Sequence, residues 1–467
     1  MSTGIKKLFK RALVFILALP MIFSVALTSG CGDNDPGYTK GEDGEFSFTK
    51  PVVIRFATPE GQFGDEITAF AAGFKKLYPQ VTIKHEPIAG DWTTKLLGQI
   101  SGGTAPDIFW GNPFTYASKG ALEPLDSYLE EFGMVKSDYY ESMFRYGTYK
   151  GKLYMMPRDY NKVVVYYNSK IFDTVFNNGA YTGATLPFRY DPDKYAATGK
   201  FYPSNGWTWD EFTATAKAIV LKSGGNFVRR GADISLNWVS GGAVILEALG
   251  CTIRAEDASG NETVNFNNET NKQIIQTEIL DRIADGSFVN TVLNDVGDFY
   301  GGKVGMVLNS RPIASNVQEK FGSEWDVVTF PLIDGNEIIP TGCSGYCLYA
   351  NSKIKDLAAR FLYYIASEEG QEIFSKTGNC TPILKEMCKD EDAAWRKYPR
   401  ADLNHEAFVW GDSYDCLSYQ FNFNNEDAVG NFEEYWGNTV VGLLNGDLNL
   451  TDALKYGQSE LLKIFVR

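Results

Sequence analysis

The chain has 467 residues, of which 44% are hydrophobic and 14% aromatic, and it carries a formal net charge of −14 at neutral pH. One ordinary hydrophobic core does not extend over this length, so we expect two domains. The acidic balance argues against nucleic acid as a partner, because binding to nucleic acid depends on neutralising phosphates with Lys and Arg. The composition therefore indicates a soluble globular protein that binds no nucleic acid.

Residues 1–30 hold four basic residues and no acidic one, and their apolar run 12–27 is short for a membrane span. The run ends in LTSGC, with the cysteine at position 31. This ending resembles the lipobox of bacterial lipoprotein signal peptides, which implies that residues 1–30 are removed and that Cys31 is acylated. An ordinary signal peptide or an uncleaved anchor is the alternative. Residues 31–50 offer little to bury, so we expect a flexible tether there.

The first part of the folded chain has the pattern of a β-α-β unit. A buried strand is predicted over 52–57, apolar residues recur at helical spacing over 67–77, and 81–85 alternate as in a second strand. This order predicts a parallel sheet. Ligands meet such sheets at the carboxyl ends of their strands, which makes Glu60 and Gln62 candidate contacts. A polar surface turn is the alternative for both residues.

Five short motifs follow one another along the chain. They are QISGGTAPDIF at 99–109, GKLY at 151–154, WTWDEF at 207–212, GKVGM at 302–306 and SEEGQ at 367–371. Each motif alone is weak, but in this order they are similar to the extracellular solute-binding proteins of ABC sugar importers, the family that includes maltodextrin-binding protein. The resemblance implies an α/β, two-lobed periplasmic-binding-protein-like fold of type II, in which each lobe has a mostly parallel sheet flanked by helices.

The stretch 149–172 contains two β-rich segments separated by a polar, aromatic joint at 157–161. Pro157 removes a backbone donor, so we expect the chain to leave one sheet there and to enter another. The resemblance implies that the chain later returns to the first lobe and then crosses once more. It assigns residues 51–157 and 336–395 to lobe 1 and residues 158–335 and 396–467 to lobe 2, with hinge strands between them.

Two helices of the second lobe carry local signals. Thr208 and Glu211 have the spacing of a capping box, which predicts a helix that begins there and runs to about residue 221. Residues 265–286 are expected to form a polar turn and then an amphipathic helix, because isoleucines recur along one face. Neither helix is assigned a site residue.

Aromatic and amide side chains stand directly after the strand predicted at 107–110. The family places an aromatic and a polar sugar contact there, so the resemblance makes Trp110 and Asn112 ligand contacts. An indole can stack on the apolar face of a sugar ring while an amide binds its hydroxyls. For Trp110, burial in the core is the alternative.

Three residues of the joint have side chains that suit a carbohydrate. We expect Asp159 and Asn161 to hydrogen-bond sugar hydroxyls and Tyr160 to stack on a sugar ring. For Asp159 the alternative is a hinge salt bridge with Arg158 or Lys162.

The resemblance also places ligand contacts in the second lobe and at the hinge. Trp238 stands where the family often offers an aromatic wall, and Ser344 lies on the hinge side of the cleft. Arg311 follows a strand that opens toward the cleft, so its fork of donors can hold hydroxyls or an acidic sugar. A salt bridge across the lobe is the alternative for Arg311. Trp410 and Trp436 are aromatic candidates from the C-terminal segment.

Six cysteines follow Cys31, and the chain has two histidines. An even number of cysteines outside the cell permits disulfides, and Cys380 and Cys388 flank a loop across which they can pair. Buried free thiols are the alternative. No Cys/His cluster has zinc spacing, and no Gly-x-Ser-x-Gly motif is present. We therefore expect no metal, no cofactor and no catalytic residue.

Together with the resemblance, these features predict a monomeric binding protein that is anchored by lipid at the outer face of a bacterial cell membrane. We expect it to capture a carbohydrate, in particular an oligosaccharide, between two lobes and to deliver it to the permease of an ABC transporter. A surface-anchored carbohydrate hydrolase and a sugar-sensing binding protein for a receptor kinase are the alternatives.

Overall fold

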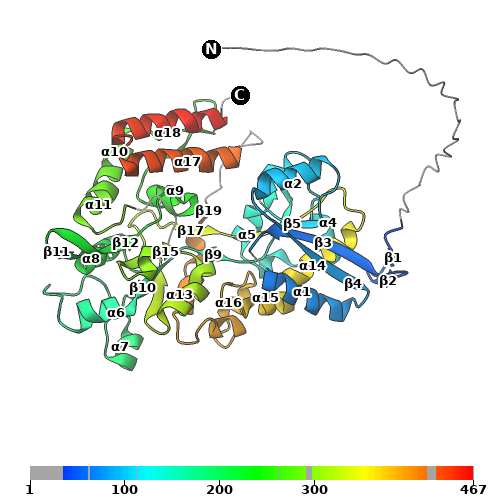
Figure 1. The fold of residues 1–467 in the computed structure, drawn as a ribbon, viewed down its shortest axis with the longest axis horizontal. Coiled ribbons are helices and arrows are strands. Elements are labelled where there is room, and N and C mark those ends of the chain that lie inside the picture. The colour runs from blue at the N-terminus through cyan, green and yellow to red at the C-terminus, as the bar shows by residue number, and fades with distance from the viewer. Residues whose placement is uncertain are drawn as a thin grey trace, which may run out of the picture. The chain divides into compact units, whose positions relative to one another are not determined.

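The computed structural model describes residues 35–61, 64–111, 113–260, 262–290, 297–417 and 428–465 (Figure 1). The chain divides into two units, residues 1–35 and residues 36–467, and the fold described below is that of the second unit. The expected signal peptide, Cys31, Gln62 and Asn112 lie outside the described residues. Within the described ranges, no helix is both long enough and apolar enough to cross a membrane.

The first of two five-stranded sheets contains the β-α-β unit that the sequence predicts. Its strand order is β4 (Val81–Ile88), β3 (Val52–Pro59), β5 (Ile108–Trp110), β18 (Gly345–Leu348) and β8 (Met155–Pro157). Strand β3 is parallel to β4 and β5, and α1 (Gly64–Leu77) connects β3 to β4. Because β18 is antiparallel to both β5 and β8, the sheet is mixed, which corrects the expectation of a mostly parallel sheet.

Both faces of this first sheet are buried. Phe56 and Ile108 lie on the face that packs against α1, α14 (Lys355–Ala366) and α15 (Glu368–Ser375), and Ala57 and Phe109 lie on the face that packs against α2 (Trp92–Ser101). Successive strand residues point to opposite faces, so a sheet covered on both sides has continuous apolar strands. The shorter elements of this half are α3 (Pro113–Ala117), α4 (Asp126–Glu131), α5 (Glu141–Tyr146), β6 (Thr148–Tyr149), β7 (Lys152–Leu153) and α16 (Lys385–Lys389).

A hairpin of β1 (Tyr38–Lys40) and β2 (Phe46–Phe48) packs on the first half. Phe46 and Phe48 each contact the ring of Tyr78, with centroid distances of 5.9 and 6.2 Å. Lys40 forms an ion pair with Glu131 at 2.5 Å. The expectation of a flexible tether over 31–50 is therefore wrong for the hairpin, because its aromatic side chains bury apolar surface.

The second five-stranded sheet is also mixed. Its strand order is β11 (Leu221–Ser223), β12 (Asn226–Asp233), β15 (Val304–Asn309), β10 (Val164–Asn168) and β16 (Trp325–Thr329). Only β12 and β15 are parallel, whereas β10 is antiparallel to its two neighbours. Strand β10 follows the joint at 157–161 directly, so it enters this sheet without the crossover helix that a parallel neighbour requires.

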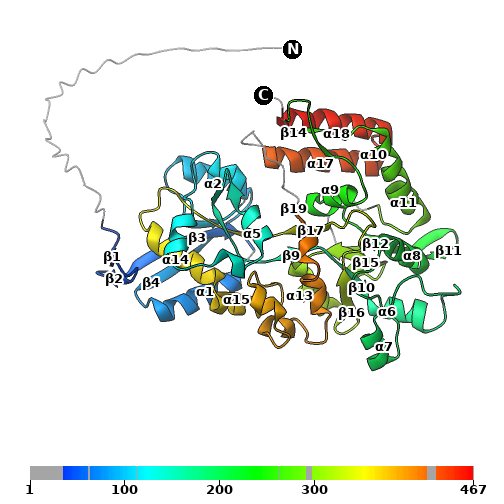
Figure 2. The same cartoon turned by 180° about the vertical axis from the view of Figure 1, so that it is seen from behind.

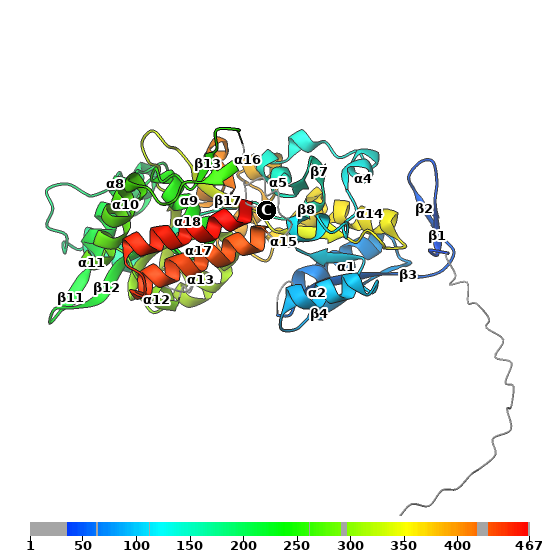
Figure 3. The same ribbon diagram turned by 90° about the horizontal axis from the view of Figure 1, so that it is seen from above.

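Helices cover the second sheet on both faces. They are α6 (Ser169–Phe172), η2 (Asp173–Asn177), α7 (Pro192–Thr198), α8 (Trp209–Ile219), α9 (Val239–Ala248), α10 (Glu269–Ile274), η3 (Ile275–Leu280), α11 (Asp281–Asp285), α12 (Gly297–Tyr300) and α13 (Ala314–Phe321). The chain ends in α17 (Ala428–Asn445) and α18 (Leu450–Phe465), which lie side by side (Figure 3). Two predictions are confirmed: Thr208 and Glu211 form a capping box at α8, and 269–285 are helical, with a π-helical segment in the middle.

A small third sheet joins the two halves (Figure 2). It consists of β19 (Asp415–Leu417), β17 (Ile339–Gly342) and β9 (Asn161–Lys162). Strand β17 is parallel to β19 and antiparallel to β9. All three strands are short and lie where the chain passes between the larger sheets, so we call this the hinge sheet.

The described cysteines are all free thiols, so of the two possibilities for Cys380 and Cys388 the structure has the unpaired one. Both side chains are fully enclosed, within the core of the first half. The other free cysteines are Cys251, Cys343, Cys347 and Cys416.

Candidate ligand-binding cleft

A cleft of about 2230 Å³ is lined by residues from both halves and from the hinge sheet. The first half contributes the aromatic side chains Trp92, Trp110, Tyr116 and Tyr146. The hinge contributes Asn161 and the run 341–345, and the second half contributes Trp238, Ser310, Pro312 and Asn316. This volume exceeds the range typical of pockets for drug-sized ligands, about 300–1,000 Å³, so the cleft has room for several sugar rings.

Two tryptophans line the cleft from different halves. Trp110 ends β5, and its ring contacts Trp92 edge-on with a centroid distance of 6.3 Å. Trp238 is the N-cap residue of α9 in the second half. Both side chains are partly exposed, so each retains apolar surface that a ligand can cover.

The hinge offers polar groups to the same cleft. Asn161 pairs with Gly342 across β9 and β17, and its side-chain oxygen Oδ1 has no hydrogen-bond partner in the described part of the chain. Ser344 lines the cleft with its Oγ fixed, because it accepts from Arg158 Nε at 2.7 Å and donates to Asp159 at 2.9 Å. Glu60 is exposed at the edge of the cleft.

The comparisons with known proteins identify the family. A family model described as "Bacterial extracellular solute-binding protein" matches residues 69–402. The chain belongs to this family. A search of curated proteins finds no matching sequence.

Solved structures with the same fold cover most of this solute-binding protein. The ABC substrate-binding protein Lmo0181 of Listeria monocytogenes, in complex with cycloalternan, has 21% identity and a TM-score of 0.68 over 89% of this chain and 99% of that one. The GacH receptor of Streptomyces glaucescens, solved unliganded and with acarbose, has 19% identity and a TM-score of 0.65 over 89% and 99%. An ABC transporter solute-binding protein of Thermotoga lettingae bound with α-D-tagatose has 15% identity and a TM-score of 0.67 over 89% and 100%. The fold is therefore the two-lobed periplasmic-binding-protein-like fold, and both the family and these neighbours are binding proteins rather than enzymes.

Two residues of the joint lie inside this solute-binding protein instead of facing the cleft. Asp159 is fully buried, accepts from Ser344 N at 2.7 Å and lies 3.4 Å from Arg158 Nε. Tyr160 is also fully buried and stacks on Tyr140 with a centroid distance of 4.1 Å. Both side chains have their partners within the protein, and neither is among the residues that line the cleft.

Arg311 is fully buried and does not line the cleft. It donates to the carbonyl of Tyr398 at 2.5 Å and of Trp395 at 3.2 Å, and its guanidinium lies between the rings of Trp395 and Phe408. Burial lowers the pKa of Arg311 to about 10. Its neighbours Ser310 and Pro312 line the cleft instead.

The two C-terminal tryptophans pack against their own half. Trp436 is fully buried in α17, where its Nε1 donates to the carbonyl of Leu236 at 3.0 Å. Trp410 is partly buried against Gly206 and Tyr414, the latter at a ring distance of 5.9 Å. Neither tryptophan is among the cleft residues.

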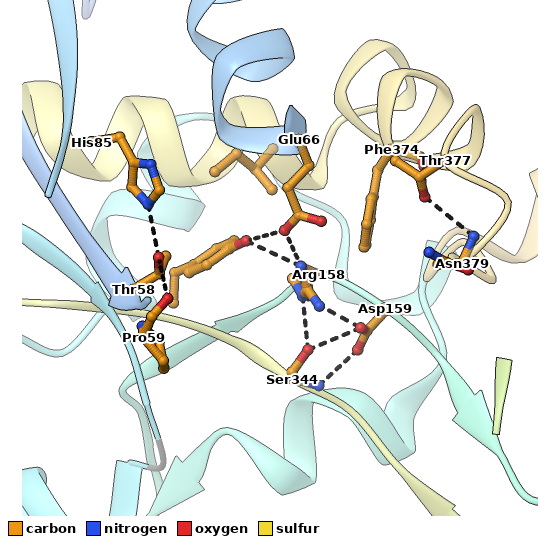
Figure 4. A network of polar contacts seen from close by, with 12 residues as sticks. Thr58, Pro59, Glu66, His85, Arg158, Asp159, Ser344, Phe374, Thr377 and Asn379 are labelled. Atoms are coloured by element: carbon orange, nitrogen blue, oxygen red, sulfur yellow. Dashed lines mark hydrogen bonds and ion pairs between the residues drawn. The ribbon is translucent and has the colours of Figure 1, made fainter. Parts of the chain in front are cut away.

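The sequence reasoning missed a buried polar network at the cleft wall (Figure 4). Glu66 of α1 accepts hydrogen bonds from Arg158 and from the hydroxyl of Tyr346, while Arg158 also contacts Asp159 and Ser344. Burial raises the pKa of Glu66. Glu66 and Trp92 both lie in the first turn of a helix. No sequence motif there distinguishes a residue that faces the cleft from one that faces the core.

Within the described ranges, no group of three or more His, Cys, Asp or Glu side chains is arranged to hold a metal ion.

Proposed function

We propose that this solute-binding protein captures a carbohydrate in the cleft and delivers it to the permease of an ABC transporter. The observation that carries the proposal is the pair Trp110 and Trp238, which line one cleft from two halves beside the polar hinge residue Asn161. Aromatic faces bind the apolar side of sugar rings, and amide groups bind the hydroxyls. The solved neighbours include complexes with cycloalternan, acarbose and α-D-tagatose, which supports a carbohydrate of unspecified length.

The mechanism we propose is closure of two lobes about the hinge sheet. We assign residues 51–157 and 336–395, with the β1–β2 hairpin, to lobe 1, and residues 158–335 and 396–467 to lobe 2. A ligand that contacts both lobes stabilises the closed form, because it binds that form more tightly than the open one. The permease then distinguishes the loaded protein by its closed shape.

The proposed ligand contacts are Glu60, Gln62, Trp110, Asn112, Asn161, Trp238 and Ser344. Five of these residues line the cleft, and the other two, Gln62 and Asn112, are kept from the family resemblance. We also propose a lipid on Cys31, residence at the outer face of the cell membrane and a monomeric state. The family description, which is that of an extracellular protein, supports the location.

A thermal-shift screen with neutral mono- and oligosaccharides tests the function. A sugar at about 100 times its Kd stabilises the folded protein by about 2.7 kcal/mol, so we expect a rise in Tm of several degrees. The same sugar is expected to lower the radius of gyration measured by small-angle scattering and to be recovered intact. A screen in which no sugar raises the Tm contradicts the proposal, and so does the appearance of shorter sugars.

A further inference from the structure

Among the described residues, only one oxygen of the Glu66 carboxylate accepts hydrogen bonds. Oε1 accepts hydrogen bonds from Arg158 Nη1 and from the Tyr346 hydroxyl, the latter at 2.7 Å. Oε2 accepts no hydrogen bond from the described residues, and Glu66 lines the cleft although only 7% of its surface is exposed. Figure 4 shows this second oxygen turned away from Arg158, toward the side on which Phe374 lies.

This arrangement leaves a rigid acceptor at the cleft wall. The two donors to Oε1 hold the carboxylate in one orientation, and Arg158 is itself held by Ser344 Oγ at 2.7 Å. Oε2 is not among the buried polar atoms that lack a partner, so it is accessible from the cleft. A ligand that brings a donor to Oε2 therefore gains the hydrogen bond without having to order the side chain.

One turn beyond Glu66, the cleft wall is formed by the short side chain of Ala69. Ala69 and Gly73 follow Glu66 at the i+3 and i+7 positions of α1, and both line the cleft. Of the residues three, four and seven further along the helix, Ala69 has a short side chain, Phe70 is buried in the core, and Gly73 is covered by the Tyr364 hydroxyl and by Ile373. Phe374 and Thr377 line the cleft from the end of α15 and the residues that follow it.

The charges around Glu66 favour a neutral ligand. Arg158 faces two carboxylates, those of Glu66 and Asp159, so the buried group carries a net negative charge. An acidic sugar brought to Oε2 meets that charge at the point of contact. Three lysines also line the cleft, namely Lys76, Lys119 and Lys376. Lys76 stands ten residues further along α1, which is about 15 Å along the helix axis, and Lys376 directly follows α15.

We propose that Glu66 Oε2 accepts hydrogen bonds from the hydroxyls of a sugar ring, and that this subsite on α1 selects neutral sugars over acidic ones. The proposal rests on the proposed function and adds a specificity-determining residue to it. A carboxylate provides several acceptor positions and no donor, which matches the hydroxyl pairs of a neutral sugar.

Glu66→Gln is the variant that tests the subsite. The amide keeps the size of the side chain and can still accept from Arg158 through its oxygen, but it then presents a donor to the cleft. Binding is measured by calorimetry with maltotriose, cellotriose and xylotriose as neutral probes and trigalacturonic acid as the acidic probe. For the neutral probe that the wild-type protein binds most tightly, we expect the affinity to fall by about tenfold or more in the variant, because hydrogen bonds to charged groups contribute more than neutral ones. We expect no binding of trigalacturonic acid to the wild-type protein.

Two variants separate this subsite from the rest of the cleft. Glu130→Gln makes the same chemical change on an exposed residue of α4 that does not line the cleft, and it should bind like the wild-type protein. Trp110→Ala should lose most of the affinity. If Trp110→Ala loses binding while Glu66→Gln stays within twofold of the wild-type protein, the subsite is refuted and the proposed function stands. If the wild-type protein binds neither these three probes nor any other sugar of the thermal-shift screen, both are refuted.

A crystal structure of the wild-type protein with the bound neutral probe provides a test that does not depend on the folding of any variant. We expect a sugar hydroxyl within hydrogen-bond distance of Glu66 Oε2. A well-ordered sugar with no hydroxyl near this oxygen refutes the subsite, even if the sugar contacts Trp110.

Discussion

His405 is held in its neutral form by two partners. Its Nδ1 accepts from Arg311 Nη1 at 3.2 Å, and its Nε2 donates to the carbonyl of Arg400 at 2.8 Å. A proton on Nδ1 would face the guanidinium of Arg311, and the ring is buried. Burial and the nearby Arg311 lower the pKa of His405 to about 3. A histidine of this kind makes folding depend on pH.

We predict that His405 destabilises the folded protein as the pH falls below about 6.5. The unfolded histidine takes up a proton near that pH, whereas the folded one does so only near pH 3, so the unfolded state binds more protons in between. The free energy of unfolding should fall by about 1.4 kcal/mol per pH unit in this window. Between pH 7 and pH 5, urea titrations should therefore show a loss about 2 kcal/mol larger for the wild-type protein than for His405→Gln.

His85→Gln is the matched control for this experiment. His85 is more exposed than His405, and its ring lies 2.7 Å from the hydroxyl of Thr58. We expect a smaller change in pH dependence for this variant. Equal pH dependence in the wild-type protein and His405→Gln would contradict the neutral state assigned to His405.

At the residue scale, the sequence predicts which residues stand at strand ends or in the hinge, but it does not predict which of their side chains are buried. Trp110, Asn161 and Ser344 line the cleft, and each is predicted from its place at a strand end or in the hinge. Arg311 also follows a strand end and is predicted to face the cleft, but aromatic rings from a distant part of the chain enclose it. Trp436 has the same chemistry as Trp110 but faces the core. The residue type alone does not separate these cases.

At the element scale, the hinge sheet is fastened by one buried carboxylate. Asp415 of β19 accepts from Lys162 of β9 at 2.5 Å and from Thr341 of β17 at 3.1 Å. It also accepts from the hydroxyls of Tyr160 and Ser142, each at 2.8 Å. These donors come from the other two hinge strands, from Tyr160 just before β9 and from α5, so Asp415 links the hinge sheet to the first half.

We predict that Asp415→Asn destabilises the protein by about 3–5 kcal/mol. The substitution leaves the ammonium of Lys162, which is 1% exposed, buried without its opposite charge. Burial already lowers the pKa of this lysine. The measurement is the free energy of unfolding from urea titration at pH 7.

The pair Asp298 and Lys303 provides the control, because its atoms lie 3.4 Å apart on the surface. Asp298→Asn should cost less than about 1 kcal/mol, as is usual for exposed pairs. Adding Lys162→Met to Asp415→Asn should recover part of the lost stability, since no buried charge then remains unpaired. A loss for Asp415→Asn no larger than that for Asp298→Asn would show that the carboxylate does not fasten the hinge.

The elements that the sequence predicted are those with local signals. The capping box at Thr208 and the apolar spacing in α1 were sufficient to locate their helices. The β1–β2 hairpin was missed because its stability comes from contacts with Tyr78, 30 or more residues further along the chain. The antiparallel neighbours of β10 were also missed, since strand pairing across a sheet leaves no local pattern.

At the scale of the whole molecule, the chain passes between the two halves more than once. Each hydrophobic core is therefore built from segments that lie far apart in the sequence. The core of the first half includes Phe56 and Phe361, and the core of the second includes Val165 and Trp436. No single motif covers both parts of a core, so the repeated crossing is expected only from the family resemblance and not from any local pattern.

We predict that Cys31→Ser moves the protein from the membrane fraction to the soluble fraction of a bacterial cell that processes lipoproteins. Residues 31–467 carry a formal charge of −18, which opposes electrostatic adherence to an anionic lipid surface. Acyl chains bind through buried CH₂ groups, at about 0.8 kcal/mol each, and this attraction does not depend on salt. The wild-type protein should therefore stay with the membrane through a wash in 1 M salt and take up labelled palmitate, whereas Cys31→Ser should do neither. If the salt wash releases the wild-type protein, or if the wild-type protein takes up no palmitate, the lipid anchor on Cys31 is contradicted.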